Sequence, residues 1–164
     1  MRVRGKALVF KILLLIHVGG AIIGLGPTMT FAVLGKLSEI AETPPAKLAI
    51  MEAISNIERK LVTPVALVTQ PVSGVLLIFK LGLNKHFFAN YWLWISILLF
   101  TGILSLSYGV SSPSVKTVIA KMRAGTFDET AMAAVKKIKT VGPLIGIMFL
   151  IVIVLMILRP GFTA

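Results

Sequence analysis

The chain has no cysteine among its 164 residues. The absence of thiols excludes disulfides, thiolate metal sites, iron–sulfur clusters and haem attached through a C-x-x-C-H motif. Acidic residues are also scarce, with 6 Asp and Glu against 17 Lys and Arg. All six lie outside the long apolar segments, at Glu39, Glu42, Glu52, Glu58, Asp128 and Glu129. We therefore expect no di-iron centre, proton-pump carboxylate or sodium site, because each needs carboxylates inside the membrane.

Motifs of nucleotide binding and hydrolysis are missing as well. The sequence has no Walker-type phosphate loop and no nucleophile elbow, and no strand precedes the Gly-Leu-Gly-Pro at 24–27. The net charge of +11 comes without an arginine run interleaved with aromatics, so we expect no nucleic-acid partner. The basic residues instead predict contact with a lipid bilayer that carries anionic headgroups. No catalytic residue is indicated, which favours a non-enzymatic protein.

Four long apolar segments make up most of the chain, at about residues 7–31, 61–80, 91–112 and 140–158. Each has about the 20 residues that cross ~30 Å of hydrocarbon as a helix. A mean hydropathy of +0.96 excludes an ordinary soluble domain, and the segments are too long for barrel strands. The first is too long for a signal peptide, so we interpret it as a retained span. The sequence predicts an all-α integral membrane protein, an antiparallel four-helix transmembrane bundle, with residues 1–164 forming one domain.

Two longer connections, at about 36–60 and 113–139, are predicted to be amphipathic helical loops. Apolar stripes recur in them at helical spacing, at Ile50, Ile54, Ile57 and Leu61 and at Val115, Val118, Ile119 and Met122. The stripes have no evident partner, so we expect lipid headgroups or another membrane subunit to cover them.

Small residues on the spans predict close helix packing. They form three faces, Gly20/Gly24, Thr101/Ser105/Gly109 and Gly142/Gly146. These faces predict a tight bundle, and we expect at least one of them to dock a helix of a second copy or of another subunit.

The orientation follows from the basic residues. With four spans, the termini and the short turn share one face with 7 Lys and Arg, and the longer connections share the other with 10. The positive-inside rule then places both termini outside the cell and the longer connections in the cytoplasm.

His17 is the one strongly polar ionisable side chain deep inside an apolar segment. Gln70 and Ser73 in the second span, and Thr101 and Ser105 in the third, lie at similar depth when counted from the span ends. A buried histidine in a membrane is a natural functional candidate. Three interpretations stay open. His17 is a neutral packing residue bonded to Gln70 or Thr101, a ligand of haem or another metal cofactor, or part of a proton relay or small-ligand site.

Haem b would need a second axial ligand or a vacant position. The other histidine, His86, lies about 15 Å of helix rise from the depth of His17 and cannot share one iron with it. Met148, near the middle of the fourth span, is the remaining candidate, although a lone Met in an apolar helix is usually a packing residue.

The stretch from Leu14 through His17 to Gly24, followed by Leu61-Val-Thr-Pro-Val and Gln70-Pro-Val-Ser-Gly74, resembles a family of uncharacterised bacterial integral membrane proteins. The resemblance covers nearly the whole chain and implies four spans with a histidine followed by glycines in the first. That family is in turn distantly similar to copper-resistance D and HemJ-type membrane domains. This similarity implies a role in haem or metal binding for His17, the one residue here that matches their first-span histidine.

Overall fold

The structure, a computed structural model, describes residues 2–160 and the side chains of residues 7–24 and 26–160. The elements, in chain order, are α1 (Arg2–Ile40), α2 (Pro44–Ile57), η1 (Glu58–Val62), η2 (Val65–Thr69), α3 (Gln70–Lys80), η3 (Leu83–His86), α4 (Tyr91–Leu106), η4 (Ser107–Ser111), α5 (Ser112–Arg123) and α6 (Glu129–Leu158). No strand occurs in this described part. The predicted all-α fold with four long apolar helices is confirmed. Arg2, Arg4 and Lys6, counted above among the basic residues, lie outside the described side chains.

The four rods are longer than the predicted spans. Residues 44–80 and 91–123 each form one continuous helical rod, and α1 continues to Ile40 through Pro27. The predicted helical loops are therefore mostly extensions of the spans, with short breaks at 41–43 and 124–128. A rod of 37 residues is about 55 Å long, so it extends well beyond ~30 Å of hydrocarbon.

Three prolines explain the irregular turns within these rods. Pro64, Pro71 and Pro113 each follow the end of a π-helical turn by two residues. In each of these turns a backbone N–H bonds the carbonyl five residues earlier, as Gln70 N–H does with the carbonyl of Val65. A proline has no N–H and its ring crowds the preceding turn, and a widened turn accommodates both without ending the helix. The rods therefore stay continuous where proline alone would predict a break.

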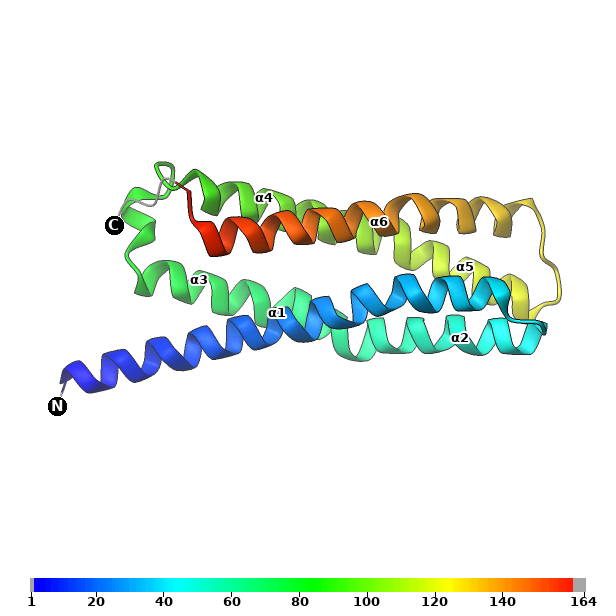
Figure 1. Ribbon diagram of the computed structural model, residues 1–164, viewed down its shortest axis with the longest axis horizontal. Coiled ribbons are helices and arrows are strands. Elements are labelled where there is room, and N and C mark those ends of the chain that lie inside the picture. The colour runs from blue at the N-terminus through cyan, green and yellow to red at the C-terminus, as the bar shows by residue number, and fades with distance from the viewer. Residues whose placement is uncertain (1, 161–164) are drawn as a thin grey trace.

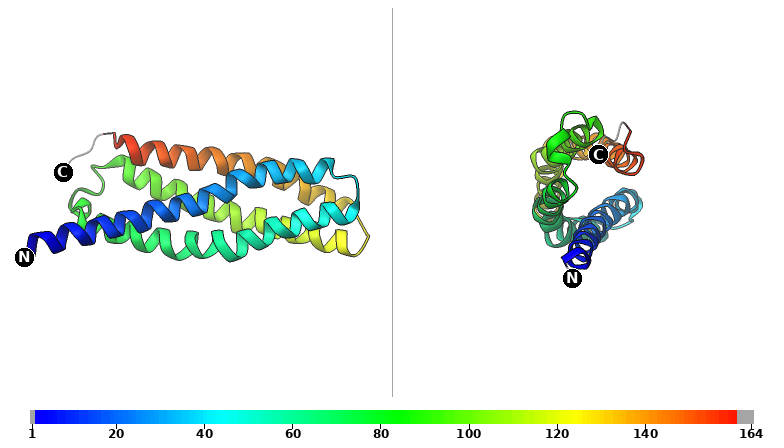
Figure 2. Two further views of the ribbon diagram at one scale, coloured as in Figure 1. Left: turned by 60° about the horizontal axis from the view of Figure 1, so that its bottom comes forward. Right: turned by 90° about the vertical axis from the view of Figure 1, so that its left-hand side faces the viewer.

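The rods form two pairs. Figure 1 shows successive rods running in opposite directions, with the Arg2 end of α1 and the Leu158 end of α6 at the same end of the molecule. α1 packs on α2, η2 and α3, and α6 packs on α4 and α5. Among the described residues the two pairs meet chiefly through α2 with α5 and α1 with α6. In both views of Figure 2 the N-terminal half of α1 diverges from α6.

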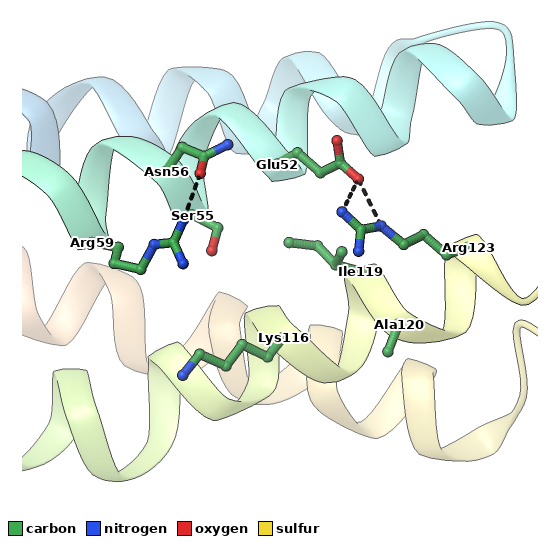
Figure 3. Close-up of a pocket in the computed structure, with 8 residues that line it drawn as sticks. All are labelled: Glu52, Ser55, Asn56, Arg59, Lys116, Ile119, Ala120 and Arg123. Atoms are coloured by element: carbon green, nitrogen blue, oxygen red, sulfur yellow. Dashed lines mark hydrogen bonds and ion pairs between the residues drawn. The ribbon is translucent and has the colours of Figure 1, made fainter.

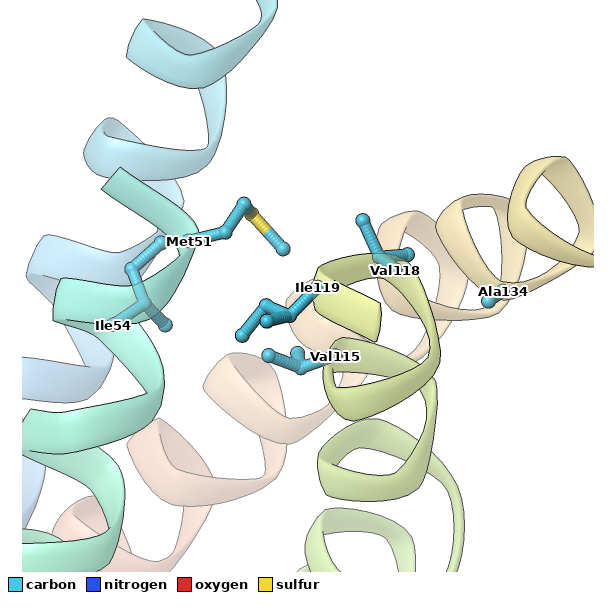
Figure 4. Close-up of a cluster of buried hydrophobic side chains, with 6 residues drawn as sticks. All are labelled: Met51, Ile54, Val115, Val118, Ile119 and Ala134. Atoms are coloured by element: carbon cyan, nitrogen blue, oxygen red, sulfur yellow. The ribbon is translucent and has the colours of Figure 1, made fainter. Parts of the chain in front are cut away.

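The largest buried cluster lies at the end with the longer connections. It brings together Met51 and Ile54 of α2, Val115, Val118 and Ile119 of α5, and Ala134 of α6 (Figure 4). Ile54 of the first predicted stripe therefore packs against Val115, Val118 and Ile119 of the second, while Leu61 at the end of the first stripe is 44% exposed. This cluster joins the two helix pairs at the end with the longer connections.

Along the apolar segments the outer surfaces stay uncovered by protein. Leu15 is 73% exposed, Ile22 67% and Ile157 73%. Soluble monomers rarely leave such long contiguous apolar surfaces open. Lipid is the environment that removes this surface from water, as the composition predicted.

Candidate functional site

The contact between α1 and α3 begins with small residues. Gly20 and Gly24 of α1 are buried, and a Cβ at Gly20 would lie 2.9 Å from Nε2 of Gln70. This close approach lets the Gln70 amide donate a hydrogen bond of 2.9 Å to the backbone carbonyl of His17. The small face predicted at Gly20/Gly24 therefore packs within the chain, against the rod of residues 44–80.

The His17 ring is oriented by Ser73. Its Nδ1 lies 2.9 Å from Oγ of Ser73, and Ser73 Oγ also donates to the carbonyl of Thr69 at short distance. A hydroxyl has one proton, so a Ser73 hydroxyl that donates to the carbonyl of Thr69 can only accept from Nδ1 of His17. Nδ1 must then be the donor in its bond to Ser73. In this arrangement the neutral imidazole carries its proton on Nδ1 and its lone pair on Nε2.

The Nε2 atom of His17 has no hydrogen-bond partner among the described residues. It is also not sealed inside the protein, because no unsatisfied side-chain nitrogen or oxygen is buried in that part of the chain. A ring whose Nδ1–H is held by a hydroxyl and whose Nε2 lone pair is open has the usual arrangement of a histidine ligand. Within the described residues no three His, Asp or Glu side chains form a metal-binding group around it.

Gly74 makes room for the imidazole. A Cβ at position 74 would lie 3.3 Å from Cε1 and 3.8 Å from Nδ1 of His17. The ring is therefore held by Ser73 and lies close to α3 at Gly74. An apolar groove of about 160 Å³ runs beside it, lined by Leu13, Ile16, Val68, Thr69, Val72, Ser73 and Leu76.

Of the residues grouped with His17 by depth, the structure brings two to it, Ser73 by a bond to the ring and Gln70 by a bond to the His17 backbone. Thr101 and Ser105 are exposed on α4 and donate to the carbonyls of Ile97 and Thr101 in their own helix. Met148 of α6 lies against Gly102 of α4, with its Cε 2.9 Å from where a Cβ would stand. These three residues belong to the second helix pair, and none of them is hydrogen-bonded to the imidazole.

Sequence reasoning placed Ser73 at the right depth but did not select it as a site residue, and it gave Gly74 no role at the ring. A signal was present, because Gln70, Ser73 and Gly74 lie three and four residues apart and so share one helix face. Thr101 and Ser105 also share a face, and counting depth gives no information on which face turns toward His17.

Residues 11–160 match the family model described as a predicted integral membrane protein (DUF2269). No curated protein matches the chain. No solved structure matches it either.

Proposed function

This chain belongs to the DUF2269 family of predicted integral membrane proteins, and we propose that it acts as a non-enzymatic cofactor-binding module of the membrane. The cofactor is held at Nε2 of His17. The observation that carries this proposal is the bond from His17 Nδ1 to Ser73, which leaves the Nε2 lone pair open at mid-depth. A histidine retained only for packing would gain most by bonding at both nitrogens, since an unpaired polar atom in hydrocarbon is unfavourable.

The alternative is a haem b-binding, oxidoreductase-like membrane protein in which His17 is the axial ligand. The residues fit one axial position, because a neutral imidazole with a hydrogen-bonded Nδ1–H is a suitable iron ligand. When bound, haem supplies one-electron chemistry. In this chain the imidazole of His17 would hold the haem, and Ser73 would orient the ring through its bond to Nδ1.

The test is an absorbance spectrum of protein purified from cells supplied with a haem precursor. A cofactor at His17 predicts a spectrum that His17→Ala abolishes while the circular dichroism of the bundle persists. Ser73→Ala should shift the spectrum without abolishing it, because the ligand remains and loses its orienting partner. Thr101→Val is the matched control from the second helix pair and should leave the spectrum unchanged.

Colourless protein, with no metal or organic cofactor detected by elemental analysis and mass spectrometry, would reject the cofactor proposal. A spectrum that survives in His17→Ala would show that a cofactor binds elsewhere. A haem-type Soret band that disappears in His17→Ala would favour the haem alternative over other cofactors.

A second candidate function, accessory subunit of a larger membrane complex, is favoured by the Thr101/Ser105/Gly109 face. Thr101, Ser105 and Gly109 are exposed, and their face of α4 and η4 offers close approach to a helix of another chain. Native mass measurement after mild detergent extraction tests this function. An assembly heavier than the 17.7 kDa chain that dissociates in Gly109→Leu supports it, and a solitary chain across several detergents and nanodiscs contradicts it.

For orientation we infer that both termini lie outside and both longer connections in the cytoplasm, from the 10 to 7 division of basic residues. A cysteine introduced at Ser38 should resist an impermeant thiol reagent in intact cells, and one at Asn84 should react. The reverse labelling would invert the topology.

A further inference from the structure

A second site lies between α2 and α5, at the end with the longer connections. It is a groove of about 320 Å³ lined by Glu52, Ser55, Asn56, Arg59, Lys116, Ile119, Ala120 and Arg123 (Figure 3). Its floor includes Ile119 of the buried cluster, so the packing of α2 on α5 fixes the spacing of its walls. The groove is distant in sequence from His17 and belongs to no part of the function proposed above.

The charges of the groove divide into a paired end and an unpaired end. At one end Arg123 contacts the Glu52 carboxylate at 2.8 and 2.9 Å, so these two charges neutralise each other. At the other end Arg59 and Lys116 lie on opposite walls, as Figure 3 shows. Among the described residues neither has a carboxylate within ion-pair distance. Glu58 lies within electrostatic range of Lys116 without forming an ion pair.

The unpaired end is also equipped with directed donors. The Arg59 guanidinium donates a 3.3 Å bond to Oδ1 of Asn56, which leaves its other N–H groups available. Ser55 adds a hydroxyl in the same wall. Two cations and a hydroxyl facing one space form a donor set suited to phosphate oxygens, because arginine matches phosphate with paired N–H groups.

The depth of the two cations identifies the source of the phosphate. Arg59 lies two residues before the apolar segment that begins at Leu61, and Lys116 lies four residues after Ser112, where the third segment ends. At 1.5 Å rise per residue these offsets are about 3 and 6 Å. The headgroup layer on each side of the hydrocarbon is about 5–8 Å thick. Both cations therefore lie at the level of lipid phosphates, whereas the paired Arg123 lies about 16 Å beyond the segment.

We propose that Arg59 and Lys116 bind the phosphate of an anionic phospholipid headgroup in the groove between α2 and α5. The headgroup bridges the two helix pairs at the end where they meet. A lipid bound there neutralises the two unpaired cations and adds a contact between α2 and α5.

The experiment compares the full chain in nanodiscs of phosphatidylcholine with and without phosphatidylglycerol, with bound lipid counted by native mass spectrometry. The double variant Arg59→Gln/Lys116→Gln should bind phosphatidylglycerol with about 25-fold weaker affinity and retain less of it. Each cation near an anionic surface contributes about fivefold to the affinity. The control Lys136→Gln/Lys137→Gln removes the same charge from exposed positions of α6 outside the groove. It should retain the lipid as the wild type does.

Equal loss in both double variants would overturn the proposal in favour of diffuse surface charge, and so would full retention in the groove variant. A further arm adds inorganic phosphate or glycerol 3-phosphate to protein in phosphatidylcholine alone. Stabilisation by these soluble anions, lost in the groove variant, would overturn the lipid assignment and assign the groove to a soluble phosphate. Melting of each variant in phosphatidylcholine confirms that the fold is intact.

Discussion

The two helix pairs of this protein are held together by different interactions. Between α1 and α3 two polar bonds cross from one helix to the other, His17 to Ser73 and Gln70 to the His17 carbonyl. Between α4 and α6 the hydroxyls of α4 bond to their own helix, and Met148 packs on Gly102. The first pair fixes a polar ring at mid-depth, and the second pair is joined by an adaptable apolar contact.

The difference shows that equal depth in the membrane is not enough to bring polar side chains of different helices together. His17, Thr101 and Ser105 lie at comparable depth, yet only His17 has a partner on another helix. A cross-helix hydrogen bond in a membrane contributes on average only about 0.6 kcal/mol. The polar bonds of the first pair therefore matter more for where the imidazole is placed than for total stability.

The largest loss of stability is expected at Gly74, where the first helix pair has no space for a side chain. Gly74→Val places methyl groups against the imidazole, whose nearest atom is already 3.3 Å from an ideal Cβ. The ring cannot move away without breaking its bond to Ser73. We expect a loss of about 1–3 kcal/mol in the free energy of unfolding, measured in mixed detergent–lipid micelles.

Gly19→Val is the matched control, because a Cβ at Gly19 meets nothing within 4 Å. It adds the same side chain to α1 with the same change in helix propensity. A loss at Gly19 as large as that at Gly74 would contradict the close packing of the ring.

The coupling energy between hydrogen-bonded side chains should be smaller than this loss and should differ between the two pairs. In a double-mutant cycle, His17→Ala and Ser73→Ala should couple by about 0.6–1.7 kcal/mol, the range of hydrogen bonds between membrane helices. Thr101→Val and Ser105→Ala should couple by less than about 0.3 kcal/mol, because Ser105 bonds the carbonyl of Thr101 rather than its side chain. Comparable coupling in both cycles would remove the distinction between the pairs.

The fold was largely predictable because hydropathy and length alone specify four membrane helices. The helical periodicity of residues 44–60 and 113–123 also predicts helix there, but their polarity assigns them to loops between the spans rather than to the rods. They continue the helices because each turn adds hydrogen bonds to an existing helix and because Ile54 packs against Val115, Val118 and Ile119. The spacing of apolar residues also does not predict the widened turns before Pro64, Pro71 and Pro113.

The candidate site was predictable only in its depth. Counting from the span ends grouped His17 with Gln70 and Ser73, and the structure joins these three residues. The same count grouped Thr101 with them, but rotation about a helix axis decides which side chains meet. Helix pairing sets that rotation here, through contacts such as Gly20 with Gln70 and Gly102 with Met148.

Gly102, in the second helix pair, should tolerate an added methyl group better than Gly74 in the first. A Cβ at Gly102 would lie 2.9 Å from Cε of Met148, closer than the 3.3 Å between Gly74 and the His17 ring. Methionine has a flexible end that can turn aside. Gly102→Ala should therefore change the free energy of unfolding by less than about 0.5 kcal/mol, and less than Gly74→Ala does. A larger loss at Gly102 would mean that Met148 is held in place, as a cofactor ligand would be.

The smallest effect is expected at the ends of the rods, where the pairs differ in their response to pH. Asp128 caps α6 by accepting from the Ala131 N–H, and Lys121 donates a hydrogen bond to the same carboxylate. The bond from Lys121 and the cap N–H together lower the pKa of Asp128 from its ordinary value. The corresponding cap of α2 is Thr43, which accepts from the Ala46 N–H and does not titrate.

A carboxyl whose pKa is lowered by folding stabilises the fold above its ordinary pKa, and that contribution is lost as the pH falls through the lowered value. Asp128→Asn keeps a capping oxygen and removes the charge, so it should lower Tm by about 1 °C at neutral pH because exposed ion pairs contribute little. The difference from the wild type should vanish in acid, below the lowered pKa. Thr43→Ala should lower Tm by the same amount at both pH values. If the Asp128→Asn difference persisted in acid, Lys121 would not be acting through the charge of the carboxylate.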